Sequence, residues 1–418
     1  MSTMSEAGLF GRLMSPECVS NPYAFYDDLR AARAVHVEGA APLAIYTRHA
    51  DVLAILQDKR FSSDWPSTYA FARPLTADEE PIFKRIVRFF GLWMQGNDGA
   101  KHLRLRNLVQ RAFTPKMLQR MDREIAGIVD HLIAEMPSSG EVDFMTAFAR
   151  PFPEYVIASM FGIDPAHRSK FANAANAVFN FLGVRDPAPG ALKNVEDNLN
   201  LVRDFLLPLI EARRTSPTED LISAFVTAEP DGDALSTEEI VVQCSMMLAA
   251  GHETTANLLG NGLLAFLKNP EQAARVRKDP ALIKTAVEEC LRFDSPSLFT
   301  VRLAAEDFEF GGLQLKRGQN VWLGLGPGNR DDSHFAEPNT FDVGRTPGKT
   351  LSLGWGAHYC LGAELSRMEG QAAFARILSD LEGLELAVDA NELTYVPNFM
   401  LRALVSLPIR YRSKGASA

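Results

Sequence analysis

The chain has 418 residues, of which 46% are hydrophobic and 23% charged, a composition typical of globular proteins. The net charge of −9 argues against bulk binding to nucleic acid. Four widely spaced cysteines do not resemble a disulfide framework or a zinc site, so we expect a reducing, cytoplasmic location. Residues 1–16 lack an apolar run of the length that a signal peptide or a membrane anchor requires, so we expect no membrane association.

The chain shows no linker or internal repeat, and we therefore expect one domain over residues 1–418, poorly ordered at residues 1–20. A helical spacing of apolar residues follows at 22–32. Two short β-like runs, 35–37 and 43–46, come next, and 51–58 indicates another short helix.

Residues 61–95 are rich in aromatic side chains and are expected to be irregular. Three prolines at positions 66, 74 and 81 interrupt regular structure there. A core-facing loop explains the aromatic residues as well as a binding pocket does. The aromatic positions are Phe61, Trp65, Tyr69, Phe71, Phe83, Phe89, Phe90 and Trp93.

The next predicted helix runs from Asn97 to about Phe113. His102 and Arg106 are four residues apart and therefore share one face. Two such groups can clamp a carboxylate, although a solvated basic face has the same pattern. Mostly amphipathic helices are predicted beyond it at 117–134, 144–161, 168–183 and 192–214.

Ser236 to Glu239 form a capping box that opens a long helix ending near Lys268. The middle of this helix, 249–255, contains a glycine and two threonines, which are poor helix formers. Here Glu253 and Thr254 set a carboxyl group beside a hydroxyl group. Such a pair can hold water and relay protons, whereas a helix weakened for packing reasons would need no such chemistry.

The segment Leu353–Gly362 places Cys360 at the end of a glycine-rich loop, directly before a helical pattern that runs to about Leu381. A cysteine at a helix N-terminus is a potential thiolate ligand for a metal, because the helix dipole favours the anion. Its glycines let the backbone approach a flat ligand closely, and His358 can donate to an anionic group. A buried structural cysteine is the alternative explanation.

This decapeptide resembles the haem-thiolate loop of the cytochrome P450 family, in which cysteine sulfur is the axial ligand of haem iron. Segment 249–255 resembles the oxygen-binding kink of that family. Leu353 stands where the family usually has Phe, a change expected to tune the iron potential without removing the ligand. The resemblance spans essentially the whole chain and implies the P450 fold, mainly α with a smaller β-rich region, about 45–50% helix.

The resemblance also implies roles for individual residues. Cys360 would be the iron ligand, and the catalytic pair would be Glu253 and Thr254. The haem b site would further include His102, Arg106, Ala250, Arg302, Leu353, His358 and Gly362. A structural triad that holds the cysteine loop would be Glu289, Arg292 and Arg345. Substrate-pocket candidates are Trp93, Leu298, Phe299 and Phe399.

These features predict a haem-thiolate monooxygenase that hydroxylates or epoxidises a largely apolar or aromatic small molecule, in natural-product biosynthesis by fold analogy. The chain has no flavin or nicotinamide fingerprint, so electrons are expected from NAD(P)H through a ferredoxin and its reductase, docked near Arg104, Arg111 and Lys349. Monomer is the family default. Whether the substrate is free or carrier-bound stays open. The alternatives are aryl coupling, nitration or another non-hydroxylating oxidation, and a non-catalytic haem sensor.

Overall fold

The structure is a computed structural model that describes residues 2–39, 42–68, 74–181, 187–227, 233–346 and 348–414. The chain divides into two compact units. The first consists of Met1–Phe61, Ile125–Phe152 and Thr254–Ala418, and the second consists of Ser62–Glu124 and Pro153–Glu253.

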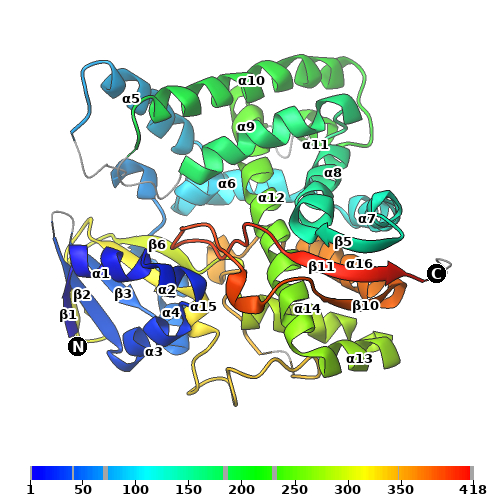
Figure 1. The fold of residues 1–418 in the computed structure, drawn as a ribbon. Helices are drawn as coiled ribbons and strands as arrows, with labels where there is room; N and C mark the ends of the chain where they lie inside the picture. The colour runs from blue at the N-terminus through cyan, green and yellow to red at the C-terminus, as the bar shows by residue number, and fades with distance from the viewer. Residues whose placement is uncertain are drawn as a thin grey trace. The chain divides into compact units, whose positions relative to one another are not determined.

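The first unit contains the largest sheet (Figure 1). Its strand order is β1-β2-β3-β9-β6-β4, with parallel pairs β1–β2 and β3–β9 and antiparallel pairs β2–β3 and β6–β9. The two β-like runs predicted near the N-terminus are confirmed as β2 and β3. The strand bounds are β1 Ser2–Ser5, β2 Ala34–Glu38, β3 Leu43–Tyr46, β4 Phe61–Ser62, β6 Phe299–Ala304 and β9 Asn320–Gly324.

The prediction of poor order at residues 1–20 is wrong for the described part of that segment, which forms β1 and two helices. Ser5 and Ser15 accept hydrogen bonds from the backbone at their helix starts, over 3.1 and 3.2 Å. Leu9 and Leu13 are buried in a core cluster with β2 and β3. The predicted helix at 22–32 is present as α3. The bounds are α1 Glu6–Leu13, α2 Pro16–Ser20 and α3 Tyr23–Ala31.

A second core cluster of the first unit lies between the sheet and α4 (His49–Gln57), the helix predicted at 51–58. Val52 and Ile55 of α4 pack with Val321 and Leu323 of β9 in this cluster. Apolar burial of this kind is the main force that fixes a helix on a sheet. The hairpin β7 (Phe308–Phe310) and β8 (Leu313–Leu315) adds Leu315 to it.

Helices of the first unit pack through glycines. A Cβ on Gly262 of α12 (Thr237–Lys268) would lie 2.5 Å from the Phe374 ring of α16, and one on Gly370 of α16 would lie 3.1 Å from Val287 of α14. Only glycine allows so close an approach. A three-stranded sheet, order β10-β11-β5, completes the unit. The bounds are α13 Pro270–Lys278, α14 Ile283–Phe293, α15 Leu325–Gly328, α16 Ala363–Asp380, β5 Ser139–Asp143, β10 Leu381–Leu386 and β11 Pro408–Ser413.

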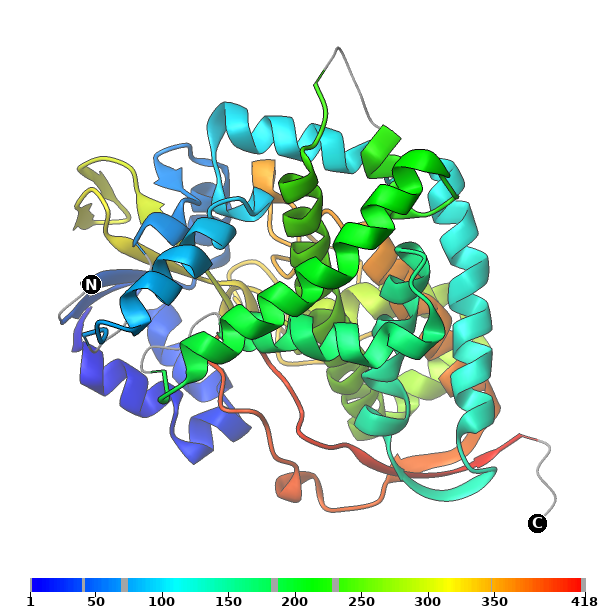
Figure 2. The same cartoon turned by 90° about the horizontal axis from the view of Figure 1, so that it is seen from above.

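The second unit is mostly helical. Its helices α5 and α10 lie side by side, as both views show (Figure 1 and Figure 2), and Arg85 on α5 pairs with Glu196 on α10 at 2.6 Å. The helices predicted near 117–134, 168–183 and 192–214 are present, although residues 182–183 lie outside the described part of the chain. The helix predicted at 144–161 is divided into a π-helical stretch, Met145–Ala149, and α8. The bounds are α5 Glu79–Phe90, α6 Gly99–Gln110, α7 Pro115–Glu135, α8 Pro151–Met160, α9 Arg168–Phe181, α10 Ala191–Thr215 and α11 Leu221–Thr227.

Residues 61–95 are more regular than predicted, because α5 occupies the second half of that stretch. Thr76 and Glu79 exchange hydrogen bonds at its start, in the manner of a capping box, over 3.0 and 3.3 Å. Pro81 falls in the first turn, where its missing N–H costs nothing. Tyr69 and Phe71 lie outside the described residues. Helix makes up 58% of the structure, above the expected 45–50%, since residues 6–20 and 79–90 are largely helical.

The long helix α12 (Thr237–Lys268) begins at the predicted capping box. The Ser236 N–H donates to the Glu239 carboxylate at 2.8 Å, and the Glu239 N–H donates to Ser236 Oγ at 3.2 Å. The α-helix is continuous through Gly251 and Thr255, the stretch predicted to contain a kink. None of the helices in the described part of the chain is long and apolar enough to cross a bilayer.

Candidate functional site

The loop before α16 closes on itself and presents Cys360 three residues ahead of the helix. The Cys360 N–H donates to the Leu353 carbonyl at 2.9 Å, and the Tyr359 N–H donates to the Gly356 carbonyl at 3.1 Å. Cys360, Leu353 and His358 are all half-buried. The loop therefore holds a thiol at its tip, partly open to a ligand.

Glycines set the path of this loop. Gly354 and Gly356 have φ of +67° and +72°, in the left-handed region that other residues rarely adopt. A Cβ on Gly356 would lie 2.7 Å from the Leu56 carbonyl oxygen, so the loop lies against α4 there. A Cβ on Gly362 would meet nothing within 4 Å, which leaves open space on that side of the loop.

The residues that lead into the loop are tied to α14 and α15 by buried polar groups. The fully buried Asn329 accepts a hydrogen bond from the Leu351 N–H at 2.7 Å and donates to Ser295 and Ser352 at 2.8 and 2.7 Å. Ser352 Oγ donates in turn to the Leu291 carbonyl at 2.5 Å. Sequence reasoning did not single out Asn329 as an anchor, because its partners lie 22 and 34 residues away.

The residues of the predicted structural triad meet in the first unit. Arg292 donates to both oxygens of Glu289 at 2.7 Å, and their side chains are 1% and 2% exposed. Arg345 Nε lies 3.2 Å from the same carboxylate. Arg292 also donates to the carbonyls of Asn329 and Pro338. Three elements thus share one buried charge network, with each ion paired as burial requires.

Arg302 lies on β6 in the first unit and is buried, and its Nη1 donates to the Val301 carbonyl at 2.8 Å. His358 closes a short 3₁₀ turn, Gly356–His358, within the cysteine loop. Both are cation-capable side chains, as an anionic ligand group would require.

The middle of α12 is less buried than its flanks. Ala250, Gly251, Glu253 and Thr254 are half-buried, whereas most other residues between Ile240 and Phe266 are buried. The boundary between the units falls between Glu253 and Thr254. The carboxyl group of Glu253 and the hydroxyl group of Thr254 therefore follow one another on a half-buried stretch of an otherwise buried helix. A proton relay needs such partial access to water.

Thr255 reveals a partner that sequence reasoning missed. Its hydroxyl donates to Glu369 of α16 at 3.0 Å, and both residues are buried. Burial raises the pKa of Glu369 to about 8, and the Thr255 hydrogen bond opposes that rise only in part. The sequence pattern could have indicated this partner, because Glu369 lies on the buried face of the predicted helix after Cys360. A glutamate is seldom buried without a partner.

In the second unit, His102 and Arg106 lie one turn apart on α6, as predicted. His102 is buried and Arg106 is half-buried. Between them, Arg104 pairs with Asp233 at 2.8 Å and with Glu239 at 2.6 Å, and these hydrogen bonds raise its pKa. Arg104 therefore braces the start of α12, and its charge is largely balanced by carboxylates.

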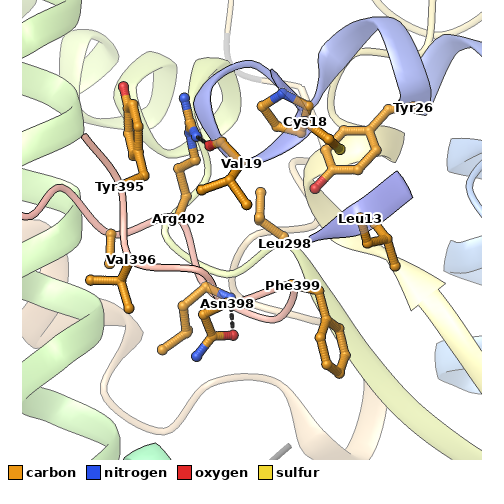
Figure 3. Close-up of a pocket in the computed structure, with 13 residues that line it drawn as sticks. Leu13, Cys18, Val19, Tyr26, Leu298, Tyr395, Val396, Asn398, Phe399 and Arg402 are labelled. Atoms are coloured by element: carbon orange, nitrogen blue, oxygen red, sulfur yellow. Dashed lines mark hydrogen bonds between the residues drawn. The ribbon is translucent and has the colours of Figure 1, made fainter. Parts of the chain in front are cut away.

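The substrate-pocket candidates of the first unit lie beside the N-terminal helices. Leu298 and Phe399 line a cavity together with Leu13 and Cys18, as Figure 3 shows. The cavity has a volume of about 20 Å³, which is room for one or two water molecules. Arg402 forms another wall, donating to the Val19 and Ser20 carbonyls at 2.6 and 2.7 Å.

Aromatic contacts hold the remaining candidates. Phe399 stacks on Trp322 with ring centroids 4.6 Å apart, and Phe299 packs against Tyr26 at 5.6 Å. In the second unit, Trp93 is buried against Phe90 at 4.9 Å. Its Nε1 has no hydrogen-bond partner among the described residues. A buried donor of this kind is costly unless something accepts from it.

The cysteine loop of the first unit fits a haem by its chemistry. The cysteine loop offers a single thiol as a metal ligand. One protein ligand is enough for haem iron, because the porphyrin supplies four nitrogen ligands. Gly362 leaves space beside that thiol, as a flat macrocycle needs. Within the same unit, Arg302 and His358 are cation-capable residues whose chemistry suits the propionates of such a group.

A model of the cytochrome P450 family matches residues 75–401. The chain is 36% identical to the vitamin D(3) 25-hydroxylase of Pseudonocardia autotrophica, covering 95% of both. It is 34% identical to the polyketide biosynthesis cytochrome P450 PksS of Bacillus subtilis (strain 168), over 93% of this chain and 95% of the relative.

The fold agrees with solved structures. The PksS structure matches with a TM-score of 0.86, covering 96% of this chain and 99% of that one. P450BioI in complex with an acyl carrier protein bearing hexadec-9Z-enoic acid also matches at 0.86, with 32% identity and 95% and 99% coverage. The predicted mainly α fold with a smaller β-rich region is thereby confirmed.

The match extends over most of the chain, in sequence as well as in fold. The family implies a haem cofactor and an external supply of electrons. The chain belongs to the cytochrome P450 family and is an oxygen-incorporating oxidoreductase, a monooxygenase.

Proposed function

We propose that this monooxygenase hydroxylates or epoxidises a largely apolar or aromatic small molecule in natural-product biosynthesis. The observation that carries the proposal is similarity over more than nine-tenths of the chain to relatives whose names specify a polyketide pathway and a vitamin D hydroxylation. The molecules behind those names are largely apolar, so the pocket of this chain would gain affinity mainly from buried apolar surface.

Cys360 would ligate the haem iron through its thiolate, and the closed, anchored loop would hold the sulfur in place. When bound, the haem supplies the oxidising chemistry, for which thiolate ligation favours O–O cleavage. His102, Arg106, Arg302 and His358 would balance the propionate charges by charge-assisted hydrogen bonds. Ala250, Leu353 and Gly362 would lie against the macrocycle, where small or apolar side chains allow close contact.

Glu253 and Thr254 would supply protons and position oxygen. The carboxyl group would release a proton and later take up another that originates in solvent, and the hydroxyl group would offer a hydrogen bond at the place where dioxygen binds. Both residues are half-buried on α12, which restricts water near them without excluding it.

Substrate selection would fall to Trp93, Leu298, Phe299 and Phe399. The indole Nε1 of Trp93 gives this set one polar donor for a carbonyl or hydroxyl group of the substrate. Trp93→Phe keeps the aromatic volume and removes the donor, so it should weaken binding of oxygen-bearing substrates about 5–10-fold. It should leave purely hydrocarbon substrates unaffected, which provides the control.

Electrons would come from NAD(P)H through a ferredoxin reductase and a ferredoxin. An acyl carrier protein accompanies the neighbouring P450BioI, and a carrier-bound substrate is the second form in which this chain would receive its substrate. The protein would work in the cytoplasm as a monomer.

A spin-state titration followed by turnover tests the proposal. Purified holoenzyme is titrated with macrolide, steroid and fatty-acid probes, each free and, for the acids, on a carrier protein. Ligands that shift the spin state are then turned over under ¹⁸O₂ with a surrogate ferredoxin system. One ¹⁸O atom per product supports monooxygenation. An oxidised product without ¹⁸O would instead support the coupling chemistry, and a spin shift without turnover would support a sensor.

A further inference from the structure

A small cavity in the second unit is lined by α8, α9 and α12. Its walls include Glu154, Ile157, Arg168, Phe171, Leu248 and His252. The cavity has a volume of about 10 Å³, close to the space that one water molecule needs.

Three polar groups reach this cavity from three helices. Glu154 of α8 is half-buried and accepts a hydrogen bond from Ser169 Oγ at 2.8 Å. Arg168 of α9 has a buried Nε with no hydrogen-bond partner among the described residues. His252 of α12 is 5% exposed. A buried water is stable when it has two to four such partners, so the cavity is suited to hold one.

His252 connects this cavity with the predicted proton-relay pair. Its Nδ1 lies 3.9 Å from Glu253 Oε1, beyond hydrogen-bond distance but close enough for the two atoms to meet after a small side-chain rotation. Helix α8 is packed tightly here, because a Cβ on Gly251 would lie 2.9 Å from Ile157 Cδ1. Gly251 thus permits the approach that brings Glu154 and His252 to one cavity.

We propose that a water in this cavity carries protons between Glu154 and His252, and that His252 passes them to Glu253. The inference rests on the proposed role of Glu253 and adds the route by which that residue is reprotonated. Among the described residues, the charged and titratable groups that line this cavity with His252 are Glu154 from α8 and Arg168 from α9, and Glu253 lies beside it on its own helix.

The proton balance is simple. Glu154 takes a proton from solvent and gives it to the cavity water, which releases a proton to one imidazole nitrogen. A small rotation brings the imidazole Nδ1 within hydrogen-bond distance of Glu253 Oε1, and the imidazole then releases its Nδ1 proton to that oxygen and returns to the neutral form. One proton moves from solvent to Glu253, and no other group changes its charge. A half-buried carboxyl group suits the outer position, because burial raises the pKa of Glu154 toward that of an effective acid–base group.

The first test measures the coupling directly. Holoenzyme labelled in its eight histidines is reduced, bound to carbon monoxide and titrated by NMR, with His252→Gln assigning the signal of interest. Glu154→Gln should move the His252 midpoint by about 0.5 pH unit or more, because a charge one water away is lost. The same midpoint in wild type and Glu154→Gln would overturn the proposal.

The second test uses turnover and its pH profile. His252→Gln should lower kcat about 10-fold, less than the 10²–10⁴-fold of a direct acid–base group, and remove one limb of the profile. His131→Gln, at an exposed histidine of α7, is the control and should change neither.

The Glu253→Gln variant separates this inference from the proposed function. If Glu253→Gln lowers turnover and His252→Gln leaves rate and profile unchanged, the inference fails and the role of Glu253 stands. If neither variant changes turnover, the role of Glu253 fails and the inference fails with it.

Discussion

The cysteine loop and the described part of the aromatic segment 61–95 are held by different forces. The approach to the loop is fixed by polar groups, through the Asn329 hydrogen bonds and the Glu289–Arg292–Arg345 network. The aromatic segment is fixed mainly by packing of Trp65, Phe90 and Trp93. Directional hydrogen bonds define the position of one sulfur atom, whereas packing tolerates substitutions of similar volume. We infer that the loop resists change and that the aromatic segment is where specificity evolves.

The largest effect is expected when the polar network is broken. Arg292→Ala leaves the buried Glu289 carboxylate without its main partner and should cost about 3–5 kcal/mol of unfolding free energy. Little holoenzyme should form, as judged by haem absorbance per chain. The matched control is Lys84→Ala in the exposed pair with Glu80, which should leave the unfolding free energy nearly unchanged because solvent screens that pair. Equal effects of the two variants would contradict the contrast.

Removing the central ring of the aromatic cluster should lower the unfolding free energy nearly as much as Arg292→Ala does. The physical cause differs, because packing is lost and no charge is left unpaired. Phe90→Ala deletes a fully buried ring and should cost about 3–4 kcal/mol through the cavity left behind. The Phe90→Leu variant should recover most of that loss. Chemical denaturation measures both, and the thiolate spectrum of the folded fraction should stay unchanged. An altered spectrum in Phe90→Leu would show that packing here also sets the iron site.

Glu369 should make stability depend on pH. Burial raises its pKa to about 8 in the folded state, so the folded protein holds a proton that the unfolded chain releases near pH 4.5. Stability from the neutral acid is present in full below pH 4.5 and is lost as pH rises to about 8. Glu369→Gln removes this loss and should exceed wild type by about 2–4 kcal/mol at pH 8.5, with no gain at pH 4.5. Parallel stability curves for the two proteins would contradict the buried neutral acid.

The smallest effect is expected at Arg104. Because its charge is balanced by Asp233 and Glu239, Arg104→Gln should cost about 0.5–1 kcal/mol and slow reduction by ferredoxin less than Lys349→Gln does. Stopped-flow reduction rates at low salt measure the second effect. A larger slowing for Arg104→Gln would place the docking surface nearer to α6 than to Lys349.

Much of the fold follows from local sequence signals. The Ser236–Glu239 capping box, the strand at 43–46 and the helix after Cys360 all carry patterns that the structure confirms. The error over residues 61–95 arose because three prolines outweighed the Thr76–Glu79 cap, although a proline in a first turn is compatible with a helix. The N-terminal helices were missed because each is short and is stabilised by burial on the sheet.

The site divides in the same way. Cys360 and the Glu289–Arg292 pair could be identified from the sequence, because each belongs to a motif that spans only a few consecutive residues. Asn329 and Glu369 were not, since their partners lie far along the chain and only the fold brings them together. Sequence spacing predicts contacts within one helix or loop, but it does not predict contacts between elements that are far apart in the sequence.

The most direct test of the account is the optical spectrum of dithionite-reduced protein with carbon monoxide, for wild type and Cys360→His. A strongly red-shifted Soret band in wild type, replaced in the variant by a band typical of histidine-ligated haem, is the predicted result. A wild-type band already typical of histidine ligation, or one that Cys360→His leaves unchanged, would contradict Cys360 as the thiolate ligand.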